Sequence, residues 1–168
     1  MTLTIRKLEK EILSTGAHVC IVTTKSGDIA NTHMDGTHPN RRIIFLDNGL
    51  ELPWLKDPKN PGMEYSLGLS LSETTKAAMD EFAPTVIHIT CPDCTALNVI
   101  EYARQNELPL MGTYHSNIPD YFDHYPGLAW LKPILWGFFK QSYNFMQTLY
   151  VPTPYIKKNL IDQQQLDQ

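Results

Sequence analysis

Short apolar segments alternate along this chain with amphipathic segments of helical periodicity, and this order constrains the possible fold most strongly. Strands are predicted at residues 18–24, 43–46, 86–90, 109–114 and 148–151, which are short, apolar and mostly rich in β-branched side chains. Helices are predicted at residues 5–13, 72–82, 93–107, 128–143 and 154–166. This alternation is typical of parallel sheets with right-handed crossovers. The sequence therefore predicts an α/β fold, with a Rossmann-like parallel sheet and helices on both faces.

Length and composition set further limits. The chain has 168 residues, enough for one domain with a substantial core. Charged residues make up 19% and the formal net charge is −4, so no broad basic surface would attract nucleic acid. No apolar run is long enough for a membrane span, and the charged N-terminus lacks the apolar core of a signal peptide. Three cysteines are too few for a disulfide framework, which indicates a reducing compartment. The location that we expect is intracellular, either cytoplasmic or in a plastid.

A cluster of polar side chains follows the predicted strand at residues 109–114. It consists of Thr113, Tyr114, His115, Ser116 and Asn117. Ligands of open α/β sheets bind just outside the carboxyl ends of strands, so this cluster is a site candidate by position and by composition. His115 closes the strand and is followed by a turn that exposes it. We therefore expect His115 to be the main functional residue.

Other titratable residues have simpler explanations. His18 and His88 lie within apolar strands, where hydrogen-bonded imidazoles of the core or the sheet end are common, so both are expected to be structural. Asp120 and Asp123 could act as general acid and base. Acidic residues at a helix start also compensate the helix dipole, and this capping role is expected first.

A C-x-x-C motif, Cys91-Pro92-Asp93-Cys94, lies between a predicted strand and a predicted helix and suggests redox chemistry as a competing function. The dipole of a helix N-terminus lowers the pKa of a thiol and would favour that role. However, neither the position of the motif nor the order of the elements fits a thioredoxin fold. A zinc site typically needs four ligands, and only these two cysteines are close in sequence. A structural role is favoured for the two cysteines.

The sequence lacks the motifs GxGxxG and GxxxxGK[ST], which bind phosphate groups, and the motif GxSxG, which holds the nucleophile of serine hydrolases.

An apolar segment begins at Leu128 and ends at Phe139, with Trp130 near its start and a lysine just beyond its end. The segment is too short to span a bilayer. It fits a helix packed on the sheet. It equally fits a segment that contacts a membrane surface, because tryptophan and lysine settle at headgroup depth.

Several motifs together resemble one known family. They lie at residues 8–24, 65–70, 82–88, 91–93, 109–119, 130–133 and 151–153. The most specific are the strand-end Tyr-His-Ser-x-x-Pro, the later Lys-Pro-x-x-Trp and the Val-Pro-Thr segment. With these motifs the chain resembles the N-terminal domain of the GT-B glycosyltransferases of family 4. Within that family it is most similar to the sulfoquinovosyl transferase (sulfolipid synthase) group.

The resemblance implies a retaining transfer of a sugar from a nucleotide-sugar, with a UDP-sugar as the expected donor, to a hydroxyl acceptor. The acceptor is expected to be a glycerolipid or a saccharide, and neither a cofactor nor a metal is expected. By resemblance, His115 is the catalytic residue beside the donor sugar. Thr113, Tyr114, Ser116 and Asn117 are its substrate-binding surround, and residues 128–139 approach the lipid or membrane surface.

The chain departs from the family pattern at both ends. The first strand, with its glycine-rich turn, is missing, and so is the nucleotide-binding domain that follows in the family. We therefore expect a single acceptor-side domain that is incomplete at both ends and inactive as an isolated chain. The missing strand would leave a sheet position unpaired and reduce solubility unless a partner fills it. The alternative is a noncatalytic remnant or binding domain that kept the fold without the activity.

Overall fold

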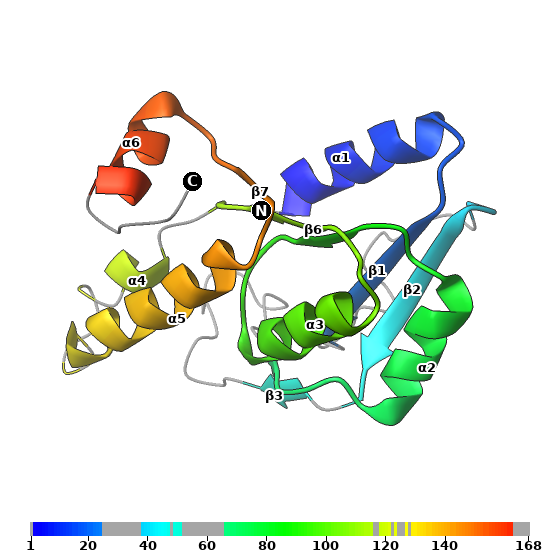
Figure 1. Ribbon diagram of the computed structural model, residues 1–168, viewed down its shortest axis with the longest axis horizontal. Helices are drawn as coiled ribbons and strands as arrows, with labels where there is room; N and C mark the ends of the chain where they lie inside the picture. Colours follow the sequence, from blue (N-terminus) through cyan, green and yellow to red (C-terminus); the bar gives the residue numbers. More distant parts are fainter. Residues whose placement is uncertain are drawn as a thin grey trace, which may run out of the picture. The chain divides into compact units, whose positions relative to one another are not determined.

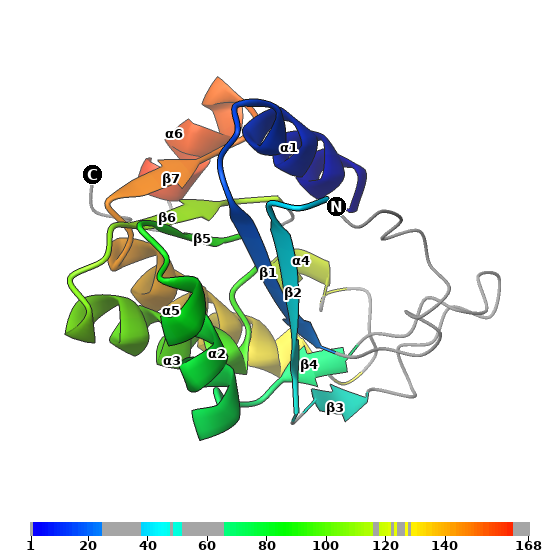
Figure 2. The ribbon, with the colours of Figure 1, turned by 90° about the vertical axis from the view of Figure 1, so that its right-hand side faces the viewer.

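The computed structural model describes residues 2–24, 38–47, 49–51, 66–115, 118–121, 123, 127 and 129–162. Internal contacts divide the chain into two compact units, Met1–Pro84 with Asp93–Asn98, and Thr85–Pro92 with Val99–Gln168. Figures 1 and 2 show the helices and strands of both units, coloured along the sequence. The expectation of one domain stays a prediction.

The first unit begins with a helix and a pair of parallel strands. α1 (Thr2–Ser14) ends before Gly16, whose φ of +85° lies in the left-handed region that favours glycine. β1 (Val19–Thr24) pairs in parallel with β2 (Arg41–Leu46) in a continuous register (Figure 2). The predicted helix and both predicted strands are confirmed.

The burial of β1 differs from the prediction. An almost wholly apolar strand is typical of a sheet covered on both faces, yet all six residues of β1 are partly exposed. In β2, by contrast, Ile44 and Leu46 are buried. Within the described residues β1 belongs to a two-stranded sheet, so β1 is paired along only one of its two edges, with β2. Apolar composition alone therefore overstated how deeply this strand is covered.

A second pair of strands in this unit was not predicted. β3 (Gly49–Glu51) and β4 (Ser66–Gly68) pair antiparallel. The lack of a strand or helix pattern over residues 47–63 predicts a loop there. That prediction is wrong at β3, while residues 52–63 lie outside the described part. Strands of three residues are too short to show an alternating pattern in the sequence.

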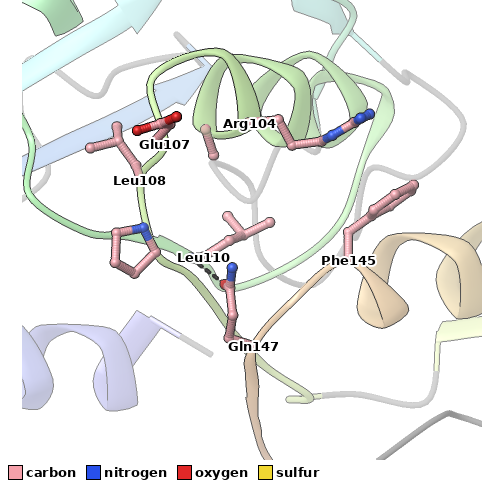
Figure 3. Close-up of a pocket in the computed structure, with 8 residues that line it drawn as sticks. Arg104, Glu107, Leu108, Leu110, Phe145 and Gln147 are labelled. Carbon is pink, nitrogen blue, oxygen red and sulfur yellow. Dashed lines mark hydrogen bonds between the residues drawn. The ribbon is translucent and has the colours of Figure 1, made fainter.

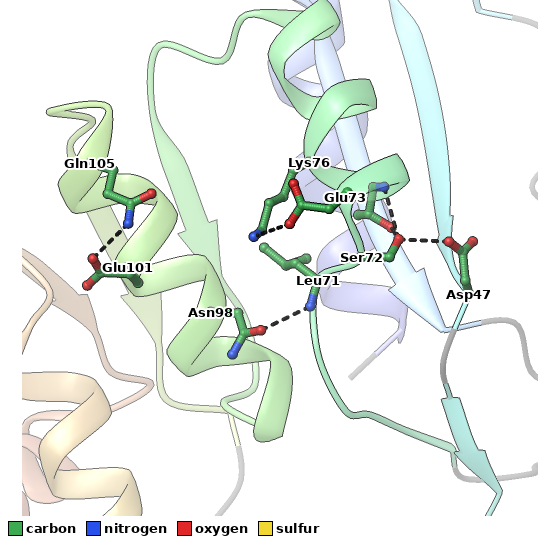
Figure 4. A network of polar contacts seen from close by, with 9 residues as sticks. Asp47, Leu71, Ser72, Glu73, Lys76, Asn98, Glu101 and Gln105 are labelled. Atoms are coloured by element: carbon green, nitrogen blue, oxygen red, sulfur yellow. Dashed lines mark hydrogen bonds and ion pairs between the residues drawn. The ribbon is translucent and has the colours of Figure 1, made fainter.

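Helix α2 (Glu73–Phe82) starts and stops where the sequence predicts. The hydroxyl of Ser72 accepts a hydrogen bond from Thr75 N at 3.1 Å and donates one to Asp47 Oδ2 at 2.7 Å (Figure 4). At the other end Ala83 adopts φ 53°, and its N–H donates to the carbonyls of Met79 and Asp80. The predicted helix at residues 72–82 is therefore confirmed, with Ser72 as its N-cap.

Asp93 caps α3 (Cys94–Gln105), the helix that follows the C-x-x-C turn. Its Oδ1 accepts hydrogen bonds from Thr95 N at 2.9 Å and Ala96 N at 3.2 Å. Its Oδ2 accepts one from Gly68 N of β4 at 3.0 Å. A side chain on Gly68 would collide with Thr95 Oγ1, so glycine is required for this close approach. The turn between the cysteines therefore ties the start of α3 to β4.

The second unit is built on three parallel strands in the order β5 (Ile87–Ile89), β6 (Leu110–Thr113), β7 (Thr148–Tyr150). The last part of α3 connects β5 to β6. Between β6 and β7 lie α4 (Ile118–Tyr121), the 3-10 helix η3 (Ala129–Leu131) and α5 (Lys132–Asn144), and α6 (Pro154–Asp162) follows β7. All three predicted strands are confirmed, with no end shifted by more than one residue. The predicted end of the last helix, residues 163–166, lies outside the described part.

In the ranges that the structure describes, no helix has both the length and the apolar character to cross a bilayer.

The two faces of this sheet differ in chemistry. Strand alternation and register place His88, Met111, Thr113 and Tyr150 on one face. Gly112 lies on the opposite face, where the side chain of Met146, which follows α5, packs against it. That opposite face carries the buried aromatic core described below. One face of the sheet is thus apolar and covered. The other carries the His88 imidazole and three hydroxyls, those of Thr113, Thr148 and Tyr150.

Candidate functional site

The polar cluster predicted from the sequence lies at the carboxyl end of β6. Thr113 is the last residue of the strand, and Tyr114 extends the pairing by donating its N–H to the carbonyl of Tyr150 at 2.8 Å. His115 follows and is partly exposed. Ser116 and Asn117, which were also predicted to bind substrate, lie outside the described residues. The strand end therefore positions Thr113 and His115 through backbone pairing with β7.

His88 on β5 joins this cluster. Its Nε2 is 2.6 Å from Thr113 Oγ1, within hydrogen-bond distance, and its ring centroid is 6.1 Å from that of Tyr150. The prediction of a hydrogen-bonded strand imidazole is confirmed for His88. Its partner, however, is the predicted site residue Thr113, and this bond between the two strands was not predicted from the sequence. The signal available was the parallel order of residues 86–90 and 109–114, which brings their ends to the same sheet edge.

Both imidazoles are held toward the neutral form. Burial lowers the pKa of His88 below its ordinary value, and the nearby His115 lowers it further by charge repulsion. Burial also lowers the pKa of His115. A neutral imidazole has one nitrogen that donates and one that accepts a hydrogen bond. At neutral pH the site therefore offers polar contacts to a neutral or hydroxylated ligand without adding positive charge.

Tyr114, between Thr113 and His115 in the chain, is buried in the core. Only 3% of its surface is exposed, and its ring packs on that of Tyr143 with centroids 5.8 Å apart. The ring of Tyr143 in turn packs on that of Phe139 in α5, with centroids 5.8 Å apart. Burial raises the pKa of Tyr143, so its phenol stays protonated. The ring of Tyr114 is thus a core side chain that anchors the strand end, and its expected contact with substrate stays a prediction.

A shallow pocket lies at the other end of β6 (Figure 3). Its volume is about 330 Å³ and its lining includes Arg104, Leu110, Phe145 and Gln147. Gln147 Oε1 accepts the N–H of Leu110 at 2.6 Å, and the Arg104 guanidinium lies 6.0 Å from the Phe145 ring centroid. Leu110 begins the strand and Thr113 ends it, so this hollow is at the amino end of β6. It is separate from the strand-end cluster.

Comparison with known proteins decides the family. Residues 2–168 match the sequence profile of Glycosyltransferase Family 4, which is nearly the whole chain. The chain belongs to this glycosyltransferase family.

A plant member of the glycosyltransferases is similar to part of this chain. Sulfoquinovosyl transferase SQD2 of Arabidopsis thaliana is 26% identical to it over 95 residues. That stretch covers 56% of this family 4 chain and 18% of the plant protein. No solved structure matches the chain.

The other histidine expected to be structural is placed differently in this family 4 chain. His18 lies just before β1 and is exposed. The expectation that His18 lies within the strand is therefore wrong, because the strand begins one residue later, and its structural role stays a prediction.

The two aspartates near the site are paired with a lysine. Lys132, at the start of α5, lies 2.8 Å from Asp120 Oδ1 and 2.6 Å from Asp123 Oδ2. These hydrogen bonds raise the pKa of Lys132. Asp120 lies in the first turn of α4, as the capping interpretation requires. Both carboxylates are engaged by one cation, an arrangement that does not favour the acid–base alternative.

The cysteine motif of this glycosyltransferase chain has a structural explanation in Asp93, which caps α3. Cys91 and Cys94 form no disulfide in the structure, and Cys91 is partly buried whereas Cys94 is exposed. Within the part of the chain that the structure describes, no group of three or more histidine, cysteine, aspartate or glutamate side chains is placed to bind a metal ion.

Proposed function

We propose that this chain is the acceptor-side part of a retaining glycosyltransferase that transfers a sugar from a UDP-sugar to a hydroxyl of a glycerolipid. The observation that carries the proposal is His115, a partly buried imidazole at the carboxyl end of β6, two residues beyond Thr113. Family membership supports transfer of a sugar from a nucleotide-sugar. In this proposal a second domain binds the nucleotide, as the resemblance implies.

The chemistry of the strand end suits a sugar in transfer. Glycosyl transfer passes through a state in which positive charge grows on the sugar ring. An imidazolium would oppose that charge, whereas burial keeps His115 toward its neutral form. A neutral imidazole and the Thr113 hydroxyl can each hydrogen-bond a sugar hydroxyl and strengthen that bond in the transition state. We propose His115 as the catalytic residue, with Thr113, Tyr114, Ser116 and Asn117 around the substrate.

A lipid acceptor is supported by exposed apolar side chains near the start of α5. Trp130 is 65% exposed and Ile134 is 59% exposed. Large apolar side chains of this kind bind at the boundary between headgroups and acyl chains. The similarity to a plant sulfoquinovosyl transferase supports a glycolipid product. We propose that this part of η3 and α5 contacts the surface of a cytoplasmic or plastid membrane that holds the acceptor.

Measurement of UDP release tests this function. The protein that contains this sequence is incubated with a panel of UDP-sugars, with and without vesicles that contain diacylglycerol, and the product lipid is analysed for its anomeric configuration. We expect UDP release that depends on the vesicles and a product that retains the donor configuration. Release that is equal without an acceptor lipid would contradict the acceptor class. No release with any donor or acceptor would favour the noncatalytic binding domain.

A further inference from the structure

A hydrogen bond between neighbouring strands links a predicted site residue to one that sequence reasoning did not assign to the site. His88 Nε2 and Thr113 Oγ1 are 2.6 Å apart. We propose that His88 is a positioning residue of the strand-end site, which fixes the direction of the Thr113 hydroxyl beside His115. The role in sugar transfer rests on the proposed function, but the positioning itself does not.

The geometry leaves the Thr113 hydroxyl a restricted choice. A threonine side chain has few χ1 rotamers, and its hydroxyl has one proton and two lone pairs. When neutral His88 accepts that proton, Thr113 presents only lone pairs to a ligand. When His88 donates through Nε2, the Thr113 proton is free to point outward. The state of the His88 ring therefore decides whether Thr113 acts as acceptor or donor toward a ligand hydroxyl.

The surroundings of His88 hold the ring in place. Its side chain is partly buried and its ring centroid is 6.1 Å from that of Tyr150, with an interplanar angle of 50°. Register pairs Thr113 with Tyr150, so the three side chains share one face of the sheet. The other titratable group that acts on His88 is His115, which disfavours its charged form. The ring is thus oriented by packing on one side and by a hydrogen bond on the other.

The experiment is an NMR titration of the ring resonances of His88 and His115 in the whole chain, with Thr113→Val and Thr113→Ser as a matched pair. Valine keeps the shape of threonine and removes the hydroxyl, whereas serine keeps the hydroxyl. We expect Thr113→Val to move the His88 pKa by about half a pH unit or more and to shift its Nε2 resonance. Thr113→Ser should restore both to the wild-type values. The nitrogen resonances of neutral His88 report the direction of the bond: an Nε2 without a proton accepts from Thr113, and a protonated Nε2 donates to it.

Unchanged His88 resonances in Thr113→Val would overturn the proposal. So would an equal change in Thr113→Ser, because the effect would then come from altered packing. A well-dispersed spectrum of each variant shows that it is folded, and His88→Gln provides a second route because an amide can replace the imidazole nitrogen. In that variant we expect the Thr113 hydroxyl to stay protected from exchange, and loss of protection would contradict the role. None of these readouts needs sugar transfer, so a failure of the proposed function would appear separately as absence of UDP release.

Discussion

The sulfur of Met146 lies where a side chain on Gly112 would begin. Gly112 is in the middle of β6, and Met146 follows the helix whose Phe139 and Tyr143 are buried in the core. The packing of the segment after α5 on the strand that carries the site therefore depends on the absence of a side chain at one position.

Gly112→Ala should destabilise the fold. The added methyl group would force Met146 and Leu149 to move, and such overpacking typically costs about 1–3 kcal/mol. The matched control is Gly137→Ala in α5, where a new Cβ meets no atom within 4 Å. That control should be neutral or stabilising by up to about 1 kcal/mol, because alanine favours helix. Urea unfolding of both variants measures this, and equal stabilities would contradict the packing account.

Asp93→Ala should weaken the link between β4 and α3. The carboxylate accepts hydrogen bonds from Gly68, Thr95 and Ala96, and loss of a capping side chain costs about 0.5–2 kcal/mol. Ser72→Ala, which removes the cap of α2, is the matched comparison. We expect Asp93→Ala to cost more than Ser72→Ala in denaturant unfolding, since Ser72 accepts one backbone hydrogen bond there. The reverse order would show that the Asp93 contacts contribute little.

The pH dependence of Asp93 has a definite sign. Burial raises its pKa above the ordinary value of 3.8 and outweighs the backbone hydrogen bonds that lower it. The folded chain therefore binds this proton more readily than the unfolded chain. Relative to Asp93→Asn, wild type should lose stability as the pH rises from 3.8 through the folded-state pKa. Unfolding midpoints across that window measure the difference, and a constant difference would contradict the shift.

The two site histidines should act at higher pH and in the opposite direction. Their folded-state pKa values lie below the ordinary 6.5, so the unfolded chain takes up protons first as the pH falls. Stability should therefore decrease as the pH falls from 6.5 through the folded-state pKa values. His88→Gln should reduce this decrease. An equally steep decrease in the variant would exclude His88 as one of its sources.

Membrane contact predicts a loss of vesicle binding when exposed apolar side chains are replaced. Trp130→Ala with Ile134→Ser should reduce co-sedimentation with phosphatidylglycerol vesicles about tenfold or more, since each large apolar group contributes about 1.5–3 kcal/mol when buried. Tyr155→Ala in α6 is the control, because this side chain is 71% exposed on another helix. Equal binding by all three proteins would contradict contact through this surface.

The sequence predicted the fold well where a structural feature depends on residues close together in the chain. Ser72 and Gly16 mark helix ends through local hydrogen bonds or φ, and such signals are readable from spacing alone. The parallel strands of the second unit were likewise predicted from their apolar, β-branched runs. The antiparallel β3–β4 pair was missed because its strands are too short to show a pattern.

Contacts between distant segments were harder to predict. The sequence singled out the strand-end position of His115 and Thr113, yet the bond from Thr113 to His88 depends on the register between β5 and β6. The ion pairs of Lys132 with Asp120 and Asp123 likewise depend on where α5 starts. Burial of Tyr114 against Tyr143 follows from a pairing of residues 29 positions apart, which no local pattern records.

The central claim is that His115 takes part in sugar transfer. The most direct test uses the protein that contains this sequence, and compares UDP release by wild type, His115→Ala and His18→Ala. His18 is exposed and lies before β1, so its variant controls for the loss of an imidazole elsewhere. We predict that His115→Ala lowers kcat by about a hundredfold or more with little change in unfolding midpoint, whereas His18→Ala keeps the wild-type rate. A rate for His115→Ala equal to that of wild type would contradict the account.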